Sequence, residues 1–146
     1  LKKIDNLMKN KIKLIFLGNK NKFNKNLQKT LIESENKTIK NKGLQINIAL
    51  NYGSKKEILD SVKILLKNKK KITEQNIQKN LYTKGIPNPD LLIRTGNTKR
   101  LSNFLLWQLS YTELFFEKKL WPDFNKNDYK KILNRFKLLK RNFGAI

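Results

Sequence analysis

Short apolar segments that alternate with longer segments of helical periodicity are the feature that most limits the fold of this chain. Three of the apolar segments end in glycine, and they cover residues 11–18, 44–53 and 90–96. A fourth apolar segment, 113–118, lies further along the chain. Aliphatic and β-branched runs of this length are typical of buried strands. The alternation therefore predicts an α/β fold with a mostly parallel sheet, flanked by helices on both faces.

The segments around these strands carry apolar residues three and four positions apart, the spacing of amphipathic helices. Helices are expected at residues 1–10 and 24–39, from Ser54 onward, after Thr73, from Ser102 to about Tyr111, and over Asn125–Arg141, with Gly144 closing the last. Ser54 and Glu57 have the spacing of a capping box, in which side chains and backbone amides of the first turn satisfy each other. We therefore expect Ser54 to be the residue that caps its helix.

The amino-acid composition limits the catalytic groups and metal ligands that this chain can use. The chain has a formal charge of +22 and contains neither cysteine nor histidine. Thiolate metal sites and disulfides are thus excluded, and catalysis would rely on carboxylates, lysine, hydroxyls or a hard, oxygen-bound cation. The lysines are spread over every segment instead of forming one stripe, so no nucleic-acid ligand is expected. Such a surface is still attracted to anionic lipid headgroups and polyphosphates.

No apolar run reaches the roughly 18 residues of a membrane span, and the first ten residues lack the features of a signal peptide. We expect a cytoplasmic location, with peripheral contact at the membrane surface. The chain begins at Leu1, inside a helical pattern. The sequence is therefore expected to be the back part of a longer one.

Arginine is rare in this lysine-rich chain, and its placement suggests a binding site. Only four arginines occur, and two of them, Arg94 and Arg100, follow one predicted strand. Ligands of open α/β sheets bind at the carboxyl ends of strands, and a helix that begins at Ser102 would add an anion-binding N-terminus. Arginine suits planar, bidentate recognition of phosphate better than lysine does. The pattern predicts a diphosphate pocket, unless both arginines simply pair with Asp90 and Glu113.

Glu113 lies within an aromatic stretch, where a lone buried carboxylate is costly unless it is paired or bound to a metal. It is therefore a candidate Mg²⁺ ligand beside the diphosphate. The alternative is a salt bridge to Arg100 or to a lysine. The aromatic residues around it are expected to form core or a subunit interface. Alternate residues of the segment 44–50, beginning with Leu44, form either the sheet core or the wall of an apolar channel.

The stretch IRTGNTKRLSNFLLWQLSYTELFFEKKLWPDF, residues 93–124, resembles the signature of the cis-prenyltransferases, and specifically the bacterial undecaprenyl diphosphate synthases. The segments LNYGSKKEI (50–58) and RNFG (141–144) resemble further motifs of that family. The similarity extends from Leu1 to Gly144. It implies that residues 1–146 are the C-terminal portion of a single cis-prenyltransferase domain.

The resemblance implies a transferase that condenses isopentenyl diphosphate onto farnesyl diphosphate in cis configuration, with Mg²⁺. The product would be undecaprenyl diphosphate, a precursor of the lipid carrier for cell-wall synthesis. By the same resemblance Arg94, Arg100 and Ser102 bind the isopentenyl diphosphate headgroup, Glu113 helps to hold Mg²⁺, and Leu44 bounds the product tunnel. A homodimer and transient membrane contact for product release are also implied.

Two departures from the family pattern qualify these expectations. Asn97 and Thr98 replace the usual Gly-Glu in the phosphate loop, which removes an acidic side chain. The family's aspartate motif, which carries the catalytic metal site, has no counterpart in this chain, so we assign no catalytic residue and expect the chain alone to be inactive. A non-catalytic partner that dimerises with an active prenyltransferase is the alternative function.

Overall fold

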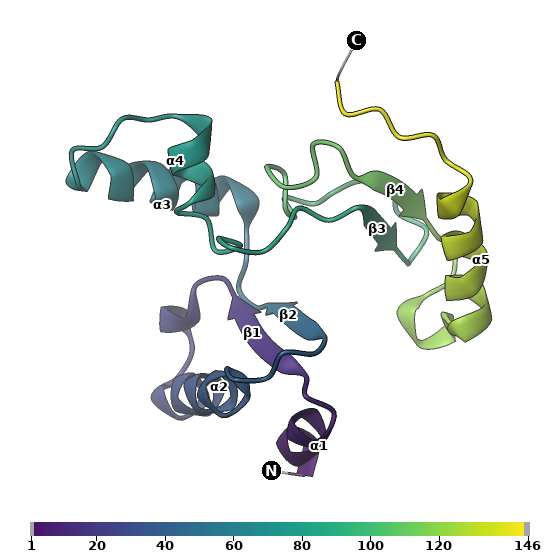
Figure 1. Ribbon diagram of the computed structural model, residues 1–146, viewed down its shortest axis with the longest axis horizontal. Coiled ribbons are helices and arrows are strands. Elements are labelled where there is room, and N and C mark those ends of the chain that lie inside the picture. Colours follow the sequence, from purple (N-terminus) through teal and green to yellow (C-terminus); the bar gives the residue numbers. More distant parts are fainter. Residues whose placement is uncertain (1, 145–146) are drawn as a thin grey trace. The chain divides into compact units, whose positions relative to one another are not determined.

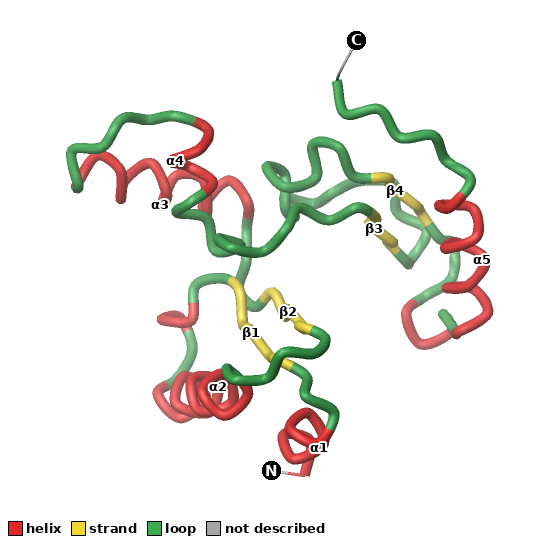
Figure 2. Tube along the Cα trace, viewed as in Figure 1, coloured by secondary structure: helices red, strands yellow, loops and turns green. Residues whose placement is uncertain are grey.

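The computed structural model describes residues 2–144, which fall into two compact units, Leu1–Gly85 and Ile86–Ile146. Each unit combines helices with one pair of parallel strands (Figures 1 and 2). The predicted α/β class with parallel strands and flanking helices is confirmed. Within each unit the described strands form one two-stranded sheet.

The first unit follows the predicted alternation closely. Its elements are α1 (Lys2–Lys9), β1 (Lys13–Leu17), the short 3-10 helix η1 (Lys20–Lys22), α2 (Lys25–Thr38), β2 (Gln45–Ala49), α3 (Ser54–Lys67) and α4 (Glu74–Gln78). β1 and β2 are parallel, in a register that runs from Lys13 opposite Gln45 to Leu17 opposite Ala49. Gly18 ends β1 with φ +112°, and a Cβ there would lie 2.1 Å from the carbonyl oxygen of Leu50. Only glycine allows the two strands to end so close together.

Helix α2 covers β1 through apolar packing and through hydrogen bonds to its free edge. Leu14 of β1 and Leu31 of α2 are both buried. The amide of Leu14 donates to Thr38 Oγ1 at 3.1 Å, and the amide of Phe16 donates to Glu35 Oε1 at 2.7 Å. These amides face away from β2. Side chains of α2 therefore satisfy the edge of β1 that no strand covers.

Strand β2 is less buried than its sequence predicts. Ile48 is 39% exposed, and Leu44, just before the strand, is 66% exposed. Both α1 and α2 pack on β1, so β1 receives most of the helical cover in this unit. The prediction that 44–53 contains a strand is thus correct, and the prediction that this strand is buried is wrong.

The start of α3 differs from the predicted capping box. The N-cap is Gly53, in an extended conformation and without a side-chain cap hydrogen bond, and Ser54 is the first helical residue. Glu57 is 1% exposed. Its carboxylate accepts hydrogen bonds from the Tyr82 amide at 2.7 Å and the Tyr52 hydroxyl at 2.5 Å. Glu57 therefore joins the start of α3 to the turn after α4.

The second unit contains β3 (Leu91–Arg94), β4 (Glu113–Phe116), the 3-10 helix η2 (Trp121–Asp123) and α5 (Lys126–Lys137). β3 and β4 are parallel, with Leu91 opposite Glu113 and Arg94 opposite Phe116. Both strands were predicted. Among the residues described, no helix is long and apolar enough to cross a membrane.

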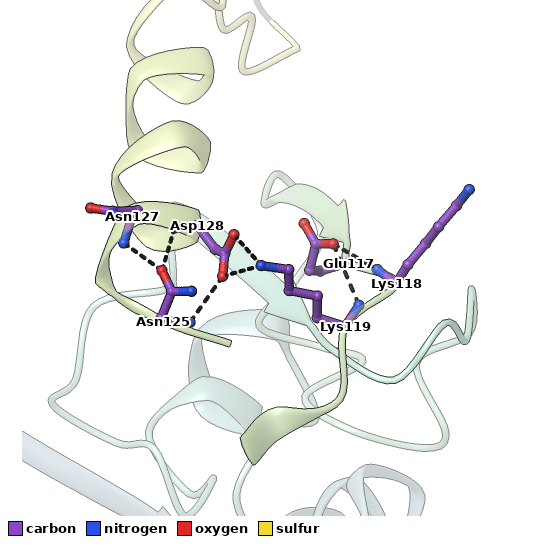
Figure 3. Close-up of polar contacts among 6 residues, drawn as sticks. All are labelled: Glu117, Lys118, Lys119, Asn125, Asn127 and Asp128. Carbon is purple, nitrogen blue, oxygen red and sulfur yellow. Dashed lines mark hydrogen bonds and ion pairs between the residues drawn. The ribbon is translucent and has the colours of Figure 1, made fainter. Parts of the chain in front are cut away.

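A capping box does form, at the start of α5 instead of α3. Asn125 Oδ1 accepts from the amides of Asn127 at 2.9 Å and Asp128 at 3.3 Å, and Asp128 Oδ2 accepts from the Asn125 amide at 3.0 Å (Figure 3). Lys119 Nζ binds both carboxylate oxygens of Asp128, at 2.8 and 2.9 Å. The helix ends at Lys137, four residues before the predicted end at Arg141.

The predicted helix from Ser102 to Tyr111 is wrong. This segment is a series of turns. Ser102, Asn103 and Leu105 have φ values of +50°, +62° and +47°. A right-handed helix cannot contain three left-handed residues within four positions. Ser102 is thus not a helix N-cap, and the expected helix-dipole contribution to anion binding is absent there.

Candidate functional site

The candidate site lies where β3 ends, and hydrogen bonds between two loops hold it in place. Arg94 is the last residue of β3, and its carbonyl accepts from the amide of Glu117 at 2.7 Å. The amides of Gly96 and Asn97 then donate to the carbonyls of Lys119 and Glu117, at 2.7 and 3.0 Å. The loop after β3 is therefore fastened to the segment that follows β4, and the base of Arg94 has a defined position.

The structure brings Arg94 and Ser102 together, as the sequence predicted. Arg94 Nη1 donates to Ser102 Oγ at 3.0 Å and also to the carbonyl oxygen of Arg100. Arg94 is half-buried, while Arg100 and Ser102 are exposed. An open depression of about 370 Å³ lies here, lined by Leu92, Ile93, Arg94, Thr95, Leu101, Ser102 and Phe104. It joins a polar end, formed by the arginine and the hydroxyl, to an apolar wall.

Neither Arg94 nor Arg100 has a carboxylate within 4.0 Å among residues 2–144. The two acids considered as their partners contact Arg141 instead. Asp90 Oδ1 lies 2.7 Å from Arg141 Nη1, and Glu113 Oε1 lies 4.0 Å from Arg141 Nε. The alternative that Arg94 and Arg100 only stiffen the loop by pairing with Asp90 and Glu113 is not what this unit shows. Their charges remain available to an anionic ligand.

Glu113 does not join this cluster. Leu91 is its partner in the β3–β4 ladder, so Glu113 lies at the start of the strand pair and Arg94 at the end. Three residues along a strand separate these positions by about 10 Å. The side chain is 35% exposed, which is less buried than predicted, and its ionic partner is Arg141, not Arg100 or a lysine. Within the described part of the chain, no three acidic residues gather as a metal site.

The remaining expectations concern apolar residues. Leu44 is 66% exposed at the start of β2, where its carbonyl accepts from the Lys13 amide at 2.9 Å. Its role in a product tunnel stays a prediction. Of the aromatic residues expected in the core or at a subunit interface, Tyr111 is 58% exposed and Trp121 is 75% exposed, so these two are not core residues. In unit two, Trp121 stacks on Phe124 with ring centroids 6.4 Å apart.

Sequence reasoning missed the central position of Arg141. Its guanidinium binds Asp90 and the carbonyl of Tyr111 and lies over two aromatic rings. The rarity of arginine in this chain was the signal that could have found it. The sequence placed Arg141 inside a helix instead, because the amphipathic pattern of α5 continues beyond the last helical turn.

Comparison with known proteins identifies the family to which this fold belongs. The family model described as "Putative undecaprenyl diphosphate synthase" matches residues 1–144. An isoprenyl transferase of Fusobacterium nucleatum is 43% identical over 142 residues, which are 97% of this chain and 61% of that protein. A ditrans,polycis-undecaprenyl-diphosphate synthase of Wigglesworthia glossinidia brevipalpis, named as specific for (2E,6E)-farnesyl diphosphate, is 43% identical and covers 98% of this chain and 58% of that one.

Among solved structures, a probable undecaprenyl diphosphate synthase from Campylobacter jejuni superposes with a TM-score of 0.89 and 34% identity. The match covers 99% of this chain and 68% of the other. The fold and the sequence are thus those of a prenyltransferase family. The chain belongs to the undecaprenyl diphosphate synthase family, and it spans about three fifths of the length of the curated relatives it matches.

Proposed function

We propose that this chain takes part in a cis-prenyltransferase reaction, in which isopentenyl diphosphate is condensed onto farnesyl diphosphate to make undecaprenyl diphosphate. One observation carries the assignment of the site. Arg94, at the end of β3, has no carboxylate within 4.0 Å among the described residues and donates to the Ser102 hydroxyl, and the carbonyl of Arg100 in the loop that follows also accepts from it. A guanidinium that has no acid nearby and is held by neutral acceptors is suited to bind phosphate oxygens.

In this proposal Arg94, Arg100 and Ser102 bind the diphosphate of the isopentenyl unit, and the apolar wall formed by Ile93 and Phe104 contacts its hydrocarbon end. The condensation forms a bond between C4 of the isopentenyl unit and C1 of the allylic partner. The C1–O bond breaks, diphosphate leaves with the electron pair, and the isopentenyl unit loses a proton. Holding the acceptor in one orientation lowers the entropic part of this barrier.

Mg²⁺ is the cofactor that we propose, and Glu113 fits it by chemistry. A partly exposed carboxylate is a hard oxygen ligand, and Mg²⁺ usually takes one or two carboxylates together with water and substrate phosphates. The position of Glu113 does not suit an ion that also contacts a diphosphate at Arg94 of the same chain. The β3–β4 register places Glu113 and Arg94 at opposite ends of the strand pair. We therefore assign Glu113 to an ion at a diphosphate held by a second copy in the homodimer.

The other proposed properties follow from the same assignment. The product is a long apolar chain that a membrane has to receive. We therefore propose that the protein is cytoplasmic and contacts the membrane surface only when it releases this product. The charge of +22 would favour contact with anionic headgroups. We propose no nucleic-acid partner. A purely dimerising subunit needs no uncompensated arginines, which favours the transferase over that alternative.

Direct binding of inorganic pyrophosphate and of isopentenyl diphosphate to this chain, measured by calorimetry, tests the site. Arg94→Lys keeps the net charge and removes the planar fork, so we expect affinity for both probes to fall by at least tenfold. Arg135→Lys is the matched control: it makes the same change in α5 of the same unit, where Arg135 lies over Phe115, and should alter affinity less than twofold.

No loss in Arg94→Lys would show that binding depends on charge alone, and equal losses in both variants would show that it does not depend on the position of the arginine; either result would contradict the assignment. A chain that binds neither probe more tightly than its Arg94→Lys variant would favour the non-catalytic dimerisation partner instead.

A further inference from the structure

The turn that joins α3 to α4 (Figure 1) is the densest cluster of positive charge in the sequence. We call it the α3–α4 tip and define it as residues 66–72. Four of the five residues 67–71 are lysine, and all four are exposed. The segment 61–73 contains no acidic residue, and within the described part of the chain none of these four lysines has an ion-pair partner. The tip therefore presents a positive charge that the protein itself does not neutralise.

Two exposed aliphatic side chains stand at the two ends of this lysine cluster. Leu66 is 61% exposed and Ile72 is 52% exposed. Leu65, the residue before Leu66, is fully buried, and Ser61 Oγ of α3 donates to the carbonyl of Ile77 in α4 at 3.0 Å. One face of α3 is thus packed, while Leu66 is left in solvent next to the lysines. Exposed aliphatic residues beside lysines are typical of surfaces that bind the interface of a membrane.

Backbone hydrogen bonds hold the tip in a defined turn. The amides of Lys69 and Lys70 donate to carbonyls of α3 at 3.0 and 2.9 Å, in the pattern of a Schellman motif. Lys69 has a φ of +52°, at the position where such a motif usually has glycine. At the other end of the tip, Asn76 Nδ2 donates to the carbonyl of Lys71 at 2.8 Å. Because the backbone is already ordered, the lysines can bind a surface without the cost of ordering a loop.

We propose that the α3–α4 tip docks on an anionic lipid surface, with its lysines at the phosphate headgroups and with Leu66 and Ile72 at the boundary of the acyl chains. This inference rests on the proposed function, in which a membrane receives the product, and it assigns that contact to one surface of the chain. Each lysine near an anionic membrane strengthens binding by about fivefold. The two aliphatic side chains add to this when the membrane removes them from water.

A nucleic acid would meet the same charges but would not use the rest of the tip. Proteins that bind single strands combine basic grooves with aromatic side chains on which the bases stack. The segment 61–73 contains neither an aromatic residue nor an arginine. Leu66 and Ile72 would remain in water beside a phosphate backbone, whereas a lipid surface has an apolar layer beneath its phosphates. The tip therefore fits a lipid surface better.

Two triple variants of the full chain separate the tip from the general charge of the protein. The tip variant removes three exposed lysines and consists of Lys69→Gln, Lys70→Gln and Lys71→Gln. The control variant removes three exposed lysines around the end of α2, in the same unit, and consists of Lys37→Gln, Lys40→Gln and Lys42→Gln. The two variants have the same net charge, so a difference between them depends on the position of the lysines.

The first readout is cosedimentation with vesicles of phosphatidylcholine, alone or mixed with an equal amount of phosphatidylglycerol. We expect the wild type to bind only the mixed vesicles. The tip variant should bind them about tenfold more weakly or worse, and the control variant should lose less than about threefold. Equal losses in the two variants, or no loss in the tip variant, would overturn the proposal.

The second readout tests whether Ile72 reaches the apolar layer. The chain contains no cysteine, so Ile72→Cys provides a single position for an environment-sensitive fluorescent dye. Ile39→Cys is the control, because Ile39 is also exposed and lies between Lys37 and Lys40. On mixed vesicles the emission should shift to the blue for the dye at position 72 and stay unchanged at position 39. The same response at both positions, or none at position 72, would refute docking through the tip.

Two further titrations distinguish this inference from its alternatives. A single-stranded oligonucleotide tests the nucleic-acid ligand: if the tip variant loses affinity for it and keeps its affinity for vesicles, the lipid assignment is wrong. Calorimetry with pyrophosphate tests the proposed function, since Arg94 lies in the other unit and the tip variant should bind pyrophosphate like the wild type. A wild type that binds vesicles through the tip but does not bind pyrophosphate would refute the diphosphate site alone. The reverse result would refute the tip alone.

Discussion

Replacing Glu57 should reveal how strongly one buried carboxylate holds the first unit together. Glu57 is 1% exposed, and its two oxygens accept from the Tyr82 amide and the Tyr52 hydroxyl at 2.7 and 2.5 Å. Glu57→Leu has similar bulk and removes both acceptors. Glu57→Gln keeps one acceptor oxygen, and its amide can donate to the hydroxyl of Tyr52.

The magnitudes follow from these contacts. A hydrogen bond to a charged group contributes about 1.5–3 kcal/mol, and each donor left without an acceptor costs about 1–3 kcal/mol. We therefore expect Glu57→Leu to lower the free energy of unfolding by about 3 kcal/mol, since better apolar packing offsets part of the loss. Glu57→Gln should cost about 1–2 kcal/mol, because neutral hydrogen bonds replace charged ones, and Tyr52→Phe should cost a similar amount, because it removes the hydroxyl but leaves the hydrogen bond from the Tyr82 amide.

Urea unfolding followed by circular dichroism measures these differences, and hydrogen exchange at the Tyr82 amide reports the contact locally. Glu33→Gln is the control: its carboxylate pairs with Lys29 at 3.9 Å and is 55% exposed, so its loss should cost less than about 0.5 kcal/mol. If Glu57→Leu costs no more than this control, or if exchange at Tyr82 does not accelerate, Glu57 does not hold these elements together.

Two further predictions concern the strand edge and the start of α5. Thr38→Val should destabilise the chain by about 1–2 kcal/mol, because the buried Leu14 amide loses its acceptor; urea unfolding checks this, and a loss near zero would contradict the role of α2 as edge cover. The hydrogen bond from Lys119, followed by that from the Asn125 backbone, holds the pKa of Asp128 below its ordinary value of 3.8. A depressed carboxyl pKa stabilises the fold fully above that ordinary value, and the effect is lost as the pH falls through the folded-state pKa. NMR titration should show this low pKa, and Lys119→Gln should raise it; an unchanged pKa would rule out the ion pair.

Local sequence patterns predicted most of the elements, because the interactions that form them are local. The strand segments 11–18 and 90–96 contain β1 and β3, and α5 begins directly after Asn125, where the predicted helix starts. The end of α5 could not be read in this way, since the amphipathic spacing continues to Arg141 although the helix stops at Lys137. Beyond the helix, Arg141 binds Asp90, 51 residues away in sequence, and helical periodicity does not report a contact of this kind.

The segment after Arg100 shows why pattern alone misled at the site. Leu101, Phe104 and Leu109 have helical spacing, and Leu109 is indeed buried, yet the backbone reaches that burial through left-handed residues at 102, 103 and 105. Periodicity reports which side chains face inward, and turns can satisfy the same requirement as a helix. Asn103 was the one local hint, because asparagine tolerates a positive φ better than most residues.

The distribution of acids in the second unit explains why its binding site keeps its charge. Asp90 and Glu113 stand at the starts of β3 and β4, where Arg141 is their ionic partner. Arg94 and Ser102 lie at the other end of β3, beyond the reach of those carboxylates. An acid beside Arg94 would neutralise the site and compete with phosphate oxygens for the same donors. Arg94 therefore keeps its charge because the acids of this strand pair stand at the opposite end of it, where Arg141 is their ionic partner.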